Sequence, residues 1–190
     1  MRLHLNKPGI RALGVAESFR QGQRRSVLAG VVMRSDFVID GVAVGRTSVG
    51  GDDATSSISH LFRKFGRNDI NLILVSGAIL SLYNIIDVDL LAKKTKLPVI
   101  CLTYKETAGI EDSIRRHFPS GAGKKLVAYA KLGKRTGVKL HTGHRVYVRT
   151  AGMEIETTQP VLDMFTLQGS VPEPVRVAKL LARALLATRS

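Results

Sequence analysis

Cysteine and aromatic residues are scarce in this 190-residue sequence. The single cysteine, Cys101, excludes an intrachain disulfide, and its place in the apolar run Pro98-Val-Ile-Cys-Leu102 indicates a buried, inert thiol. Aromatic residues make up only 5% of the chain, whereas 44% of its residues are hydrophobic. We therefore expect a core built from Val, Leu, Ile and Ala.

Long apolar runs are absent as well. No stretch approaches the roughly 20 apolar residues that a membrane-spanning helix needs, and the first residues lack the apolar core of a signal peptide. The sequence therefore predicts a cytoplasmic protein without a membrane segment.

Acidic residues are outnumbered by basic ones, with 15 Asp and Glu against 29 Lys and Arg and a net charge of +14. The basic residues recur from Arg2 to Arg189, so the folded body itself is expected to be positive. Such a charge attracts polyanions, and nucleic acid, either DNA or RNA, is the expected partner. An acidic membrane surface is the rival, but no helix combines a basic face with the exposed bulky aromatics of an interfacial anchor. We expect no membrane partner.

Three strands without an intervening helix are predicted near the start of the chain, which favours an antiparallel beginning of a sheet. Short apolar runs place these strands over residues 12–16, 27–33 and 37–44.

The strongest helix signal follows these strands. Ile58, Leu61, Phe62 and Phe65 repeat at helical spacing, and Asp53 stands where such a helix would be capped. By this pattern alone, Asp53 is a helix cap rather than a metal ligand.

The remaining elements complete an α/β pattern. A nearly continuous apolar strand, a helix and a second buried strand follow over residues 70–75, 87–96 and 99–104. The order β-β-β-α-β-α-β predicts a mixed five-stranded sheet with helices on both faces. Additional C-terminal elements are predicted near residues 124–131, 145–149, 156–167 and 174–187. We expect residues 1–190 to form one domain, in which roughly 70% of the unfolded surface becomes buried.

The last predicted helix is amphipathic, and its polar face is basic. Arg176, Lys179 and Arg183 recur at helical spacing on that face, which predicts a surface that contacts phosphate or solvent. The apolar residues expected on the other side are Val177, Leu180, Leu181 and Ala184.

Four segments, spread in order along the chain, resemble an uncharacterised archaeal protein family that is itself similar to endonuclease V. They are Arg11-Ala-Leu-Gly-Val-Ala-Glu-Ser-Phe19, Val49-Gly-Gly-Asp-Asp-Ala-Thr55, Tyr83-Asn-Ile-Ile-Asp87 and Pro172-Glu-Pro-Val-Arg-Val-Ala178. The resemblance implies a ribonuclease H-like fold and cleavage of a phosphodiester bond near deaminated adenine, in DNA or RNA.

The resemblance also implies a divalent cation, Mg²⁺ or Mn²⁺, held by carboxylates. Glu17 matches the first of these carboxylates, because it ends the first strand. Asp53 matches the second, and the neighbouring Asp52 is the alternative.

Further matches concern residues that would handle phosphate. Lys105 follows a predicted strand, and Gly143-His-Arg145 is similar to a Gly-His-Arg segment of endonuclease V. The resemblance implies that Lys105 neutralises developing charge and that His144 and Arg145 contact or protonate phosphate oxygens. Arg176 and Lys179 on the basic helix face would bind the nucleic-acid strand.

The third carboxylate of endonuclease V has no counterpart, because Leu74-Val-Ser-Gly77 places Ser76 at that point. A neutral hydroxyl weakens the charge balance of a site for a hard cation. The aromatic and proline wedge of the enzyme also lacks a counterpart near Thr47-Ser-Val-Gly50. Two main hypotheses follow: a metal-dependent nuclease, and a nucleic-acid-binding protein that has lost a competent metal site. An enzyme acting on a nucleotide or another small phosphate compound is the third.

Overall fold

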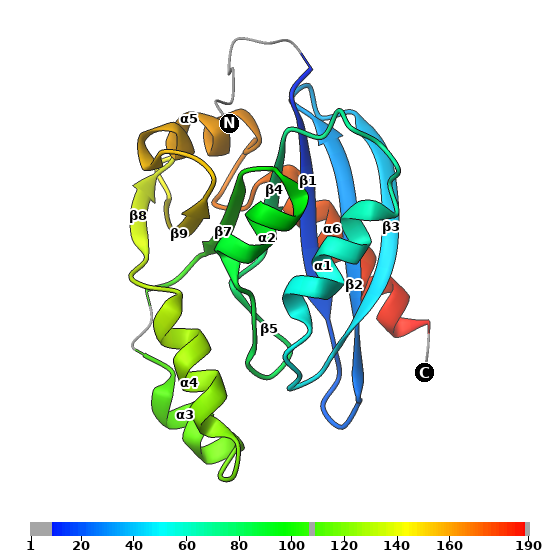
Figure 1. Ribbon diagram of the computed structural model, residues 1–190. Helices are drawn as coiled ribbons and strands as arrows, with labels where there is room; N and C mark the ends of the chain where they lie inside the picture. The colour runs from blue at the N-terminus through cyan, green and yellow to red at the C-terminus, as the bar shows by residue number, and fades with distance from the viewer. Residues whose placement is uncertain (1–8, 107–108, 189–190) are drawn as a thin grey trace.

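A seven-stranded mixed sheet organises residues 9–106 and 109–188, which the computed structural model describes (Figure 1). The sheet order is β3 (Ile39–Ser48), β2 (Arg25–Arg34), β1 (Arg11–Ser18), β4 (Leu72–Val75), β7 (Val99–Thr103), β9 (Arg145–Ala151) and β8 (Thr136–Lys139). A separate short hairpin pairs β5 (Ile79–Leu80) with β6 (Asn84–Ile85). The helices are α1 (Ala54–Arg63), α2 (Val88–Thr95), α3 (Glu111–His117), α4 (Ala122–Lys131), α5 (Thr158–Met164), which follows the 3-10 turn η1 (Ile155–Thr157), and α6 (Glu173–Ala187).

Strand β1 lies in the interior of the sheet, where it pairs antiparallel with β2 and parallel with β4. Residues 12–16 are all buried, as expected of a strand covered on both faces. Strand β7 continues the sheet parallel to β4, and β9 returns antiparallel to β7. The predicted mixed sheet with helices on both faces is confirmed. The predicted five-stranded unit consists of β3, β2, β1, β4 and β7. The C-terminal strands β9 and β8 extend it.

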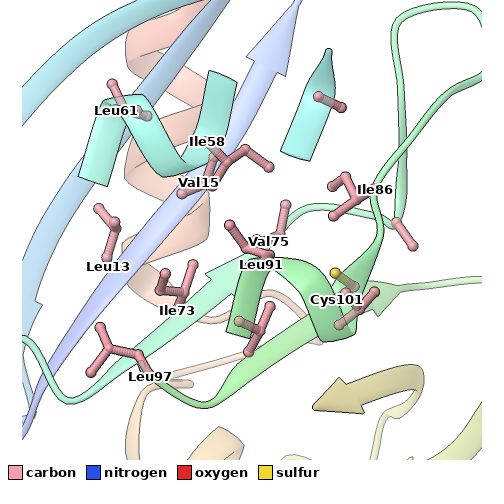
Figure 2. Packing of buried hydrophobic residues seen from close by; sticks show 14 of the residues in the cluster. Leu13, Val15, Ile58, Leu61, Ile73, Val75, Ile86, Leu91, Leu97 and Cys101 are labelled. Atoms are coloured by element: carbon pink, nitrogen blue, oxygen red, sulfur yellow. The ribbon is translucent and has the colours of Figure 1, made fainter. Parts of the chain in front are cut away.

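One face of the sheet is covered by α1 and α2. Ile58 and Leu61 of α1 are fully buried above Leu13 and Val15 of β1 (Figure 2). Cys101 of β7 lies in the same cluster, and burial raises the pKa of its thiol to about 12. The prediction of a buried thiol in an aliphatic core is therefore confirmed.

The opposite face is covered by α5 and α6. The first turn of α6 lies directly on Gly14, where an added Cβ would be 2.2 Å from the backbone of Pro174. Glycine at this position therefore permits the close approach of helix and strand.

The buried face of α6 differs from the predicted one. Leu180 is 53% exposed, whereas Ala178 and Ala182 are fully buried against β1 and β2. The buried stripe of α6 runs through Val175, Ala178, Ala182 and Leu186, and Leu180 lies on the other side of the helix. The basic residues Arg176 and Arg183 are exposed, as predicted.

Three elements were not predicted: the β5–β6 hairpin, α3 and β8. Each strand of the hairpin has only two residues, which is too short for a hydrophobic period. In α3 only Ile114 is buried, so this helix has no readable period either. Within the described part of the chain, no helix is long and apolar enough to cross a bilayer.

Replacing Gly14 with alanine is expected to destabilise the protein by about 1–3 kcal/mol, because the added methyl group meets backbone that cannot rotate away. Chemical denaturation monitored by circular dichroism measures the change. Gly123→Ala is the control, since nothing lies within 4 Å of its added Cβ and alanine favours the helix. An unchanged denaturation midpoint for Gly14→Ala would contradict the proposed close contact.

Candidate active site

The parallel strands β1, β4 and β7 end at one edge of the sheet. Their register aligns Val15 with Val75 and Cys101, so alternate residues of all three strands point to the face that carries α1. Glu17 follows Val15 by two residues and therefore points to this face as well. Polar groups at the carboxyl ends of parallel strands are the usual position of a binding crevice in such sheets.

The Glu17 carboxylate is held by the β5–β6 hairpin. The backbone N–H of Ser81 donates to Oε1 at 3.2 Å, and the Ser81 hydroxyl donates to Oε2 at 2.6 Å. The Ser81 carbonyl in turn accepts from the Gly50 N–H at 2.8 Å. One serine therefore connects Glu17 to the loop that leads into α1.

The Asp53 carboxylate is surrounded by neutral donors. Its Oδ1 accepts from the Thr47 hydroxyl at 2.8 Å, and its Oδ2 accepts from the Ser48 hydroxyl at 3.0 Å; the Ser48 N–H contacts both oxygens. Asn84 adds a further hydrogen bond to Oδ1 at 2.7 Å. Desolvation opposes ionisation, but the hydrogen bonds from Asn84, Ser48 and Thr47 outweigh it and lower the pKa of Asp53 to about 2.

Asn84 is the fully buried centre of this network. Its Nδ2 donates to Asp53, to the Thr47 hydroxyl and to the Ser48 carbonyl, and its Oδ1 accepts from the Ala54 N–H at 2.9 Å. Asp53 stands at the predicted N-cap position, but its side chain makes no cap hydrogen bond. The prediction that the Asp53 side chain caps the helix is therefore wrong. The acceptor for the Ala54 N–H comes instead from Asn84, thirty residues after Ala54.

Asp52 has a different environment from Asp53. Its carboxylate pairs with Lys124 at 2.8 Å and with Lys125 at 3.1 Å, and these lysines lower its pKa despite partial desolvation. The Lys125 side chain is almost completely buried, where its ammonium also donates to the Gly51 and Tyr83 carbonyls and lies over the Phe118 ring. The charge of Asp52 is thus neutralised by the protein, and its contacts fasten α4 to the loop before α1.

Neither Glu17 nor Asp53 forms an ion pair with any residue in the ranges 9–106 and 109–188. The same ranges contain no group of three or more His, Cys, Asp or Glu that could hold a metal ion. Magnesium in proteins is often held by only one or two carboxylates, with water and substrate phosphates as its other ligands. The two unpaired carboxylates fit a cation of that kind.

Ser76 follows β4 at the same sheet edge, and its N–H donates to the Val15 carbonyl at 2.9 Å. Burial raises the pKa of the Tyr104 hydroxyl to about 12, and the nearby Ser76 hydroxyl opposes this rise only in part. Lys105 is exposed two residues beyond the end of β7. The place predicted for a third carboxylate is therefore occupied by a neutral serine.

His144 and Arg145 lie in and just after the β8–β9 turn. Because Thr103 at the end of β7 pairs with Tyr147, Arg145 extends past that end. His144 is exposed, with Nδ1 3.2 Å from the Thr142 carbonyl, and the turn is fixed to α5 by the His141 N–H, which donates to Asp163.

Arg176 and Lys179 lie on α6, which covers the face of the sheet opposite Glu17 and Asp53 (Figure 1). The Arg176 guanidinium pairs with Glu173, a buried carboxylate in the first turn of the same helix. The structure therefore brings Glu17 and Asp53 to one face and edge and separates Arg176 and Lys179 from them.

Sequence reasoning missed the roles of Asn84, Ser81 and Thr47. Asn84 does lie within the segment Tyr83-Asn-Ile-Ile-Asp87, which was singled out for its resemblance, but no spacing rule links it to Asp53.

A model of the protein family described as Endonuclease dU matches residues 8–186 of this chain. The UPF0215 protein of Pyrobaculum aerophilum is 34% identical over 173 residues, which cover 90% of this chain and 92% of the relative. The predicted resemblance to an archaeal endonuclease V-like family is confirmed by these matches.

Two solved structures share the fold. A protein of unknown function from Archaeoglobus fulgidus has a TM-score of 0.79 and 22% identity, covering 93% of this chain and 98% of its own. Endonuclease V from Ciona intestinalis, crystallised with DNA containing an inosine, has a TM-score of 0.64 and 12% identity, covering 96% of this chain and 87% of its own. The predicted ribonuclease H-like α/β fold is confirmed.

The contribution of Asp53 to stability is expected to depend on pH. Its folded pKa of about 2 lies below the ordinary value of 3.8, so its stabilising effect is present above about pH 4 and is lost as the pH falls toward 2. Asp53→Asn should therefore lower the free energy of unfolding by about 2 kcal/mol at neutral pH and by much less near pH 2.

Urea unfolding at a series of pH values measures this difference. Asp36→Asn is the control, because Asp36 is half-exposed in a surface pair with Arg34. If the effect of Asp53→Asn were the same at every pH, the proposed anionic role of this carboxylate would be refuted.

Proposed function

Because the chain belongs to the endonuclease dU family, we propose that it is an endonuclease that cleaves a phosphodiester bond in DNA containing deoxyuridine or another deaminated nucleoside. The observation that carries the proposal is the pair Glu17 and Asp53, two carboxylates without ion pairs at the carboxyl edge of the sheet. The inosine-containing DNA bound to the Ciona intestinalis enzyme supports a deaminated base as the target.

Two uncompensated carboxylates at a surface that binds phosphate would repel it. A cation between carboxylate and phosphate removes that repulsion, which supports a role for Mg²⁺ or Mn²⁺. Glu17 and Asp53 would hold the ion, and Asp52 is the less suitable ligand because Lys124 and Lys125 already neutralise it. A bound divalent cation supplies Lewis-acid polarisation of the phosphate and a more acidic water molecule.

The other residues of the site orient the two carboxylates or interact with the negative charge of the phosphate. Ser81 orients the Glu17 carboxylate, and Asn84 fixes Asp53 at the start of α1. Lys105 neutralises negative charge that develops on the phosphate, while His144 protonates or contacts a phosphate oxygen and Arg145 binds a neighbouring phosphate. These three side chains are exposed. Lys105 follows the end of β7, and His144 and Arg145 lie at the start of β9, which pairs with that end of β7.

Arg176 and Lys179 lie on the opposite face, so we assign them no part in cleavage. We propose only that they contribute to the long-range attraction between the net +14 chain and a polyanion.

A second candidate function is nucleic-acid binding without cleavage. Ser76 favours this alternative, because a serine replaces the third carboxylate of endonuclease V and provides no negative charge for a cation. In that case the chain would bind DNA or RNA in a salt-sensitive manner and leave it intact.

Glu17→Gln tests the proposed nuclease. The purified wild-type chain is incubated with labelled DNA containing deoxyuridine, inosine or neither, and with the matching RNA, in Mg²⁺, Mn²⁺ or EDTA. We expect metal-dependent cleavage of the deoxyuridine strand and a decrease of at least about 100-fold in Glu17→Gln, because a cation that stabilises the transition state contributes several kcal/mol.

Asp36→Asn is the matched control, since it also removes one carboxylate but lies in the turn between β2 and β3, outside the proposed site. Cleavage by wild type and control but not by Glu17→Gln supports the proposal. Tight binding without cleavage in either metal would refute it and support the binding protein.

A further inference from the structure

A basic groove lies beside the candidate site, between the end of α4 and the outer strands of the sheet. Its volume is about 700 Å³. It is lined by four cations and only two carboxylates, together with two tyrosines; the charged and aromatic residues are Lys134, Arg135, Arg145, Arg149, Glu106, Glu111, Tyr129 and Tyr147.

The floor of the groove is set by the alternation of β9. Val146 and Val148 are buried toward α5, so Arg145, Tyr147 and Arg149 face the groove. Arg145 and Arg149 are four residues apart, which corresponds to about 13 Å along a strand.

The cations of the groove are held close to one another. The Arg149 guanidinium is partly buried and donates to the Gly133 carbonyl at 3.1 and 3.2 Å. Burial, followed by repulsion from Arg135, lowers the pKa of Arg149. An anion bound beside these two guanidinium groups would offset their mutual repulsion.

Two features leave room for bases as well as phosphates. The Tyr147 ring is positioned by its hydroxyl, which donates to Glu106 at 3.0 Å. Gly137 of β8 lies opposite Tyr147, and an added Cβ there would be 3.5 Å from Arg145 and 3.7 Å from Tyr147. The missing side chain therefore keeps the floor open, and the partly exposed Tyr129 and Tyr147 are aromatic surfaces on which unpaired bases can stack.

The groove and the candidate site share one face of the sheet. The register places Arg149 beside Cys101, which lies in line with Val75 and Val15, and Glu17 follows Val15 on the same side. Glu106 of the groove directly follows Lys105 at the end of β7. A nucleic-acid strand bound at the candidate site would therefore continue along this edge into the groove.

We propose that the groove of Lys134, Arg145, Tyr147 and Arg149 binds a single-stranded DNA segment that flanks the cleaved bond. This inference rests on the proposed nuclease function and specifies where the substrate lies. A single strand is favoured over a duplex because the tyrosines and the open floor at Gly137 fit exposed bases, which a paired duplex does not offer.

The test uses two groove variants on the Glu17→Gln background, so that binding is measured without cleavage. The double variant Lys134→Ala with Arg149→Ala removes two charges from the groove, and Gly137→Phe fills its floor without changing charge. The matched control is Lys93→Ala with Lys94→Ala, which removes two exposed charges from α2. Fluorescence anisotropy with a short deoxyuridine-containing oligonucleotide, single-stranded or duplex, gives the Kd over a range of salt concentrations.

Both groove variants should weaken single-strand binding by at least about 10-fold, the effect of losing one stacked base. The double groove variant should also reduce the slope of log K against log salt by about 1.4, the value for two phosphate contacts to a single strand. The control should change Kd by less than about threefold, the size of a surface charge effect, and leave the slope unchanged. Circular dichroism confirms that each variant is folded.

Groove variants that bind like the control would overturn the inference, and a loss that is equal for duplex and single strand would overturn the choice of a single strand. Failure of the nuclease proposal looks different. In that case the wild-type chain cleaves nothing, while the groove variants still lose single-strand binding.

Discussion

The hydrogen bonds of Asn84 are the interaction on which the candidate site depends. Its buried amide joins the end of β3 to the start of α1 and fixes Asp53 between them. The amide reaches this position through a turn in which Leu82 and Tyr83 both have positive φ, at 50° and 63°. Such a conformation is unfavourable for residues with side chains, so the surrounding contacts must hold it. The Tyr83 ring packs on His117 and Phe118, and its carbonyl accepts from Lys125.

The helical hairpin of α3 and α4 is therefore part of the site, although it lies outside the central sheet (Figure 1). Lys125 and Phe118 join it to the turn that carries Asn84, and Lys124 and Lys125 join it to Asp52. The same hairpin forms one wall of the basic groove, through Tyr129 and the residues that follow α4. Contacts that stabilise Asp53 thus also determine where the groove lies relative to the candidate site.

Much of the fold could be predicted from the sequence, because strands such as β1 and helices such as α1 have strong hydrophobic periods. Glu17 could be assigned to a strand end for the same reason. The partner of Asp53 could not, since Asn84 is thirty-one residues away and its role arises only when β6 packs beside α1. Local rules assign an aspartate at a helix start to capping, whereas the tertiary contact gives that task to Asn84. The exposure of Leu180 was missed because the sequence pattern assigns the leucines to the buried face of α6, whereas a stripe that includes Ala178 and Ala182 faces the sheet.

Ser76 also affects how a cation would be held. A third carboxylate would fill a further coordination position of a divalent ion before the substrate arrives. Glu17 and Asp53 alone match the charge of such an ion but leave more of its coordination positions to water and phosphate oxygens. Asp53 is further constrained, because its two oxygens already accept hydrogen bonds from four donor groups of three residues, Thr47, Ser48 and Asn84. If Glu17 and Asp53 hold a cation as proposed, cation and nucleic acid should bind together, and the proposed groove would add affinity for phosphate to that of the two-carboxylate site.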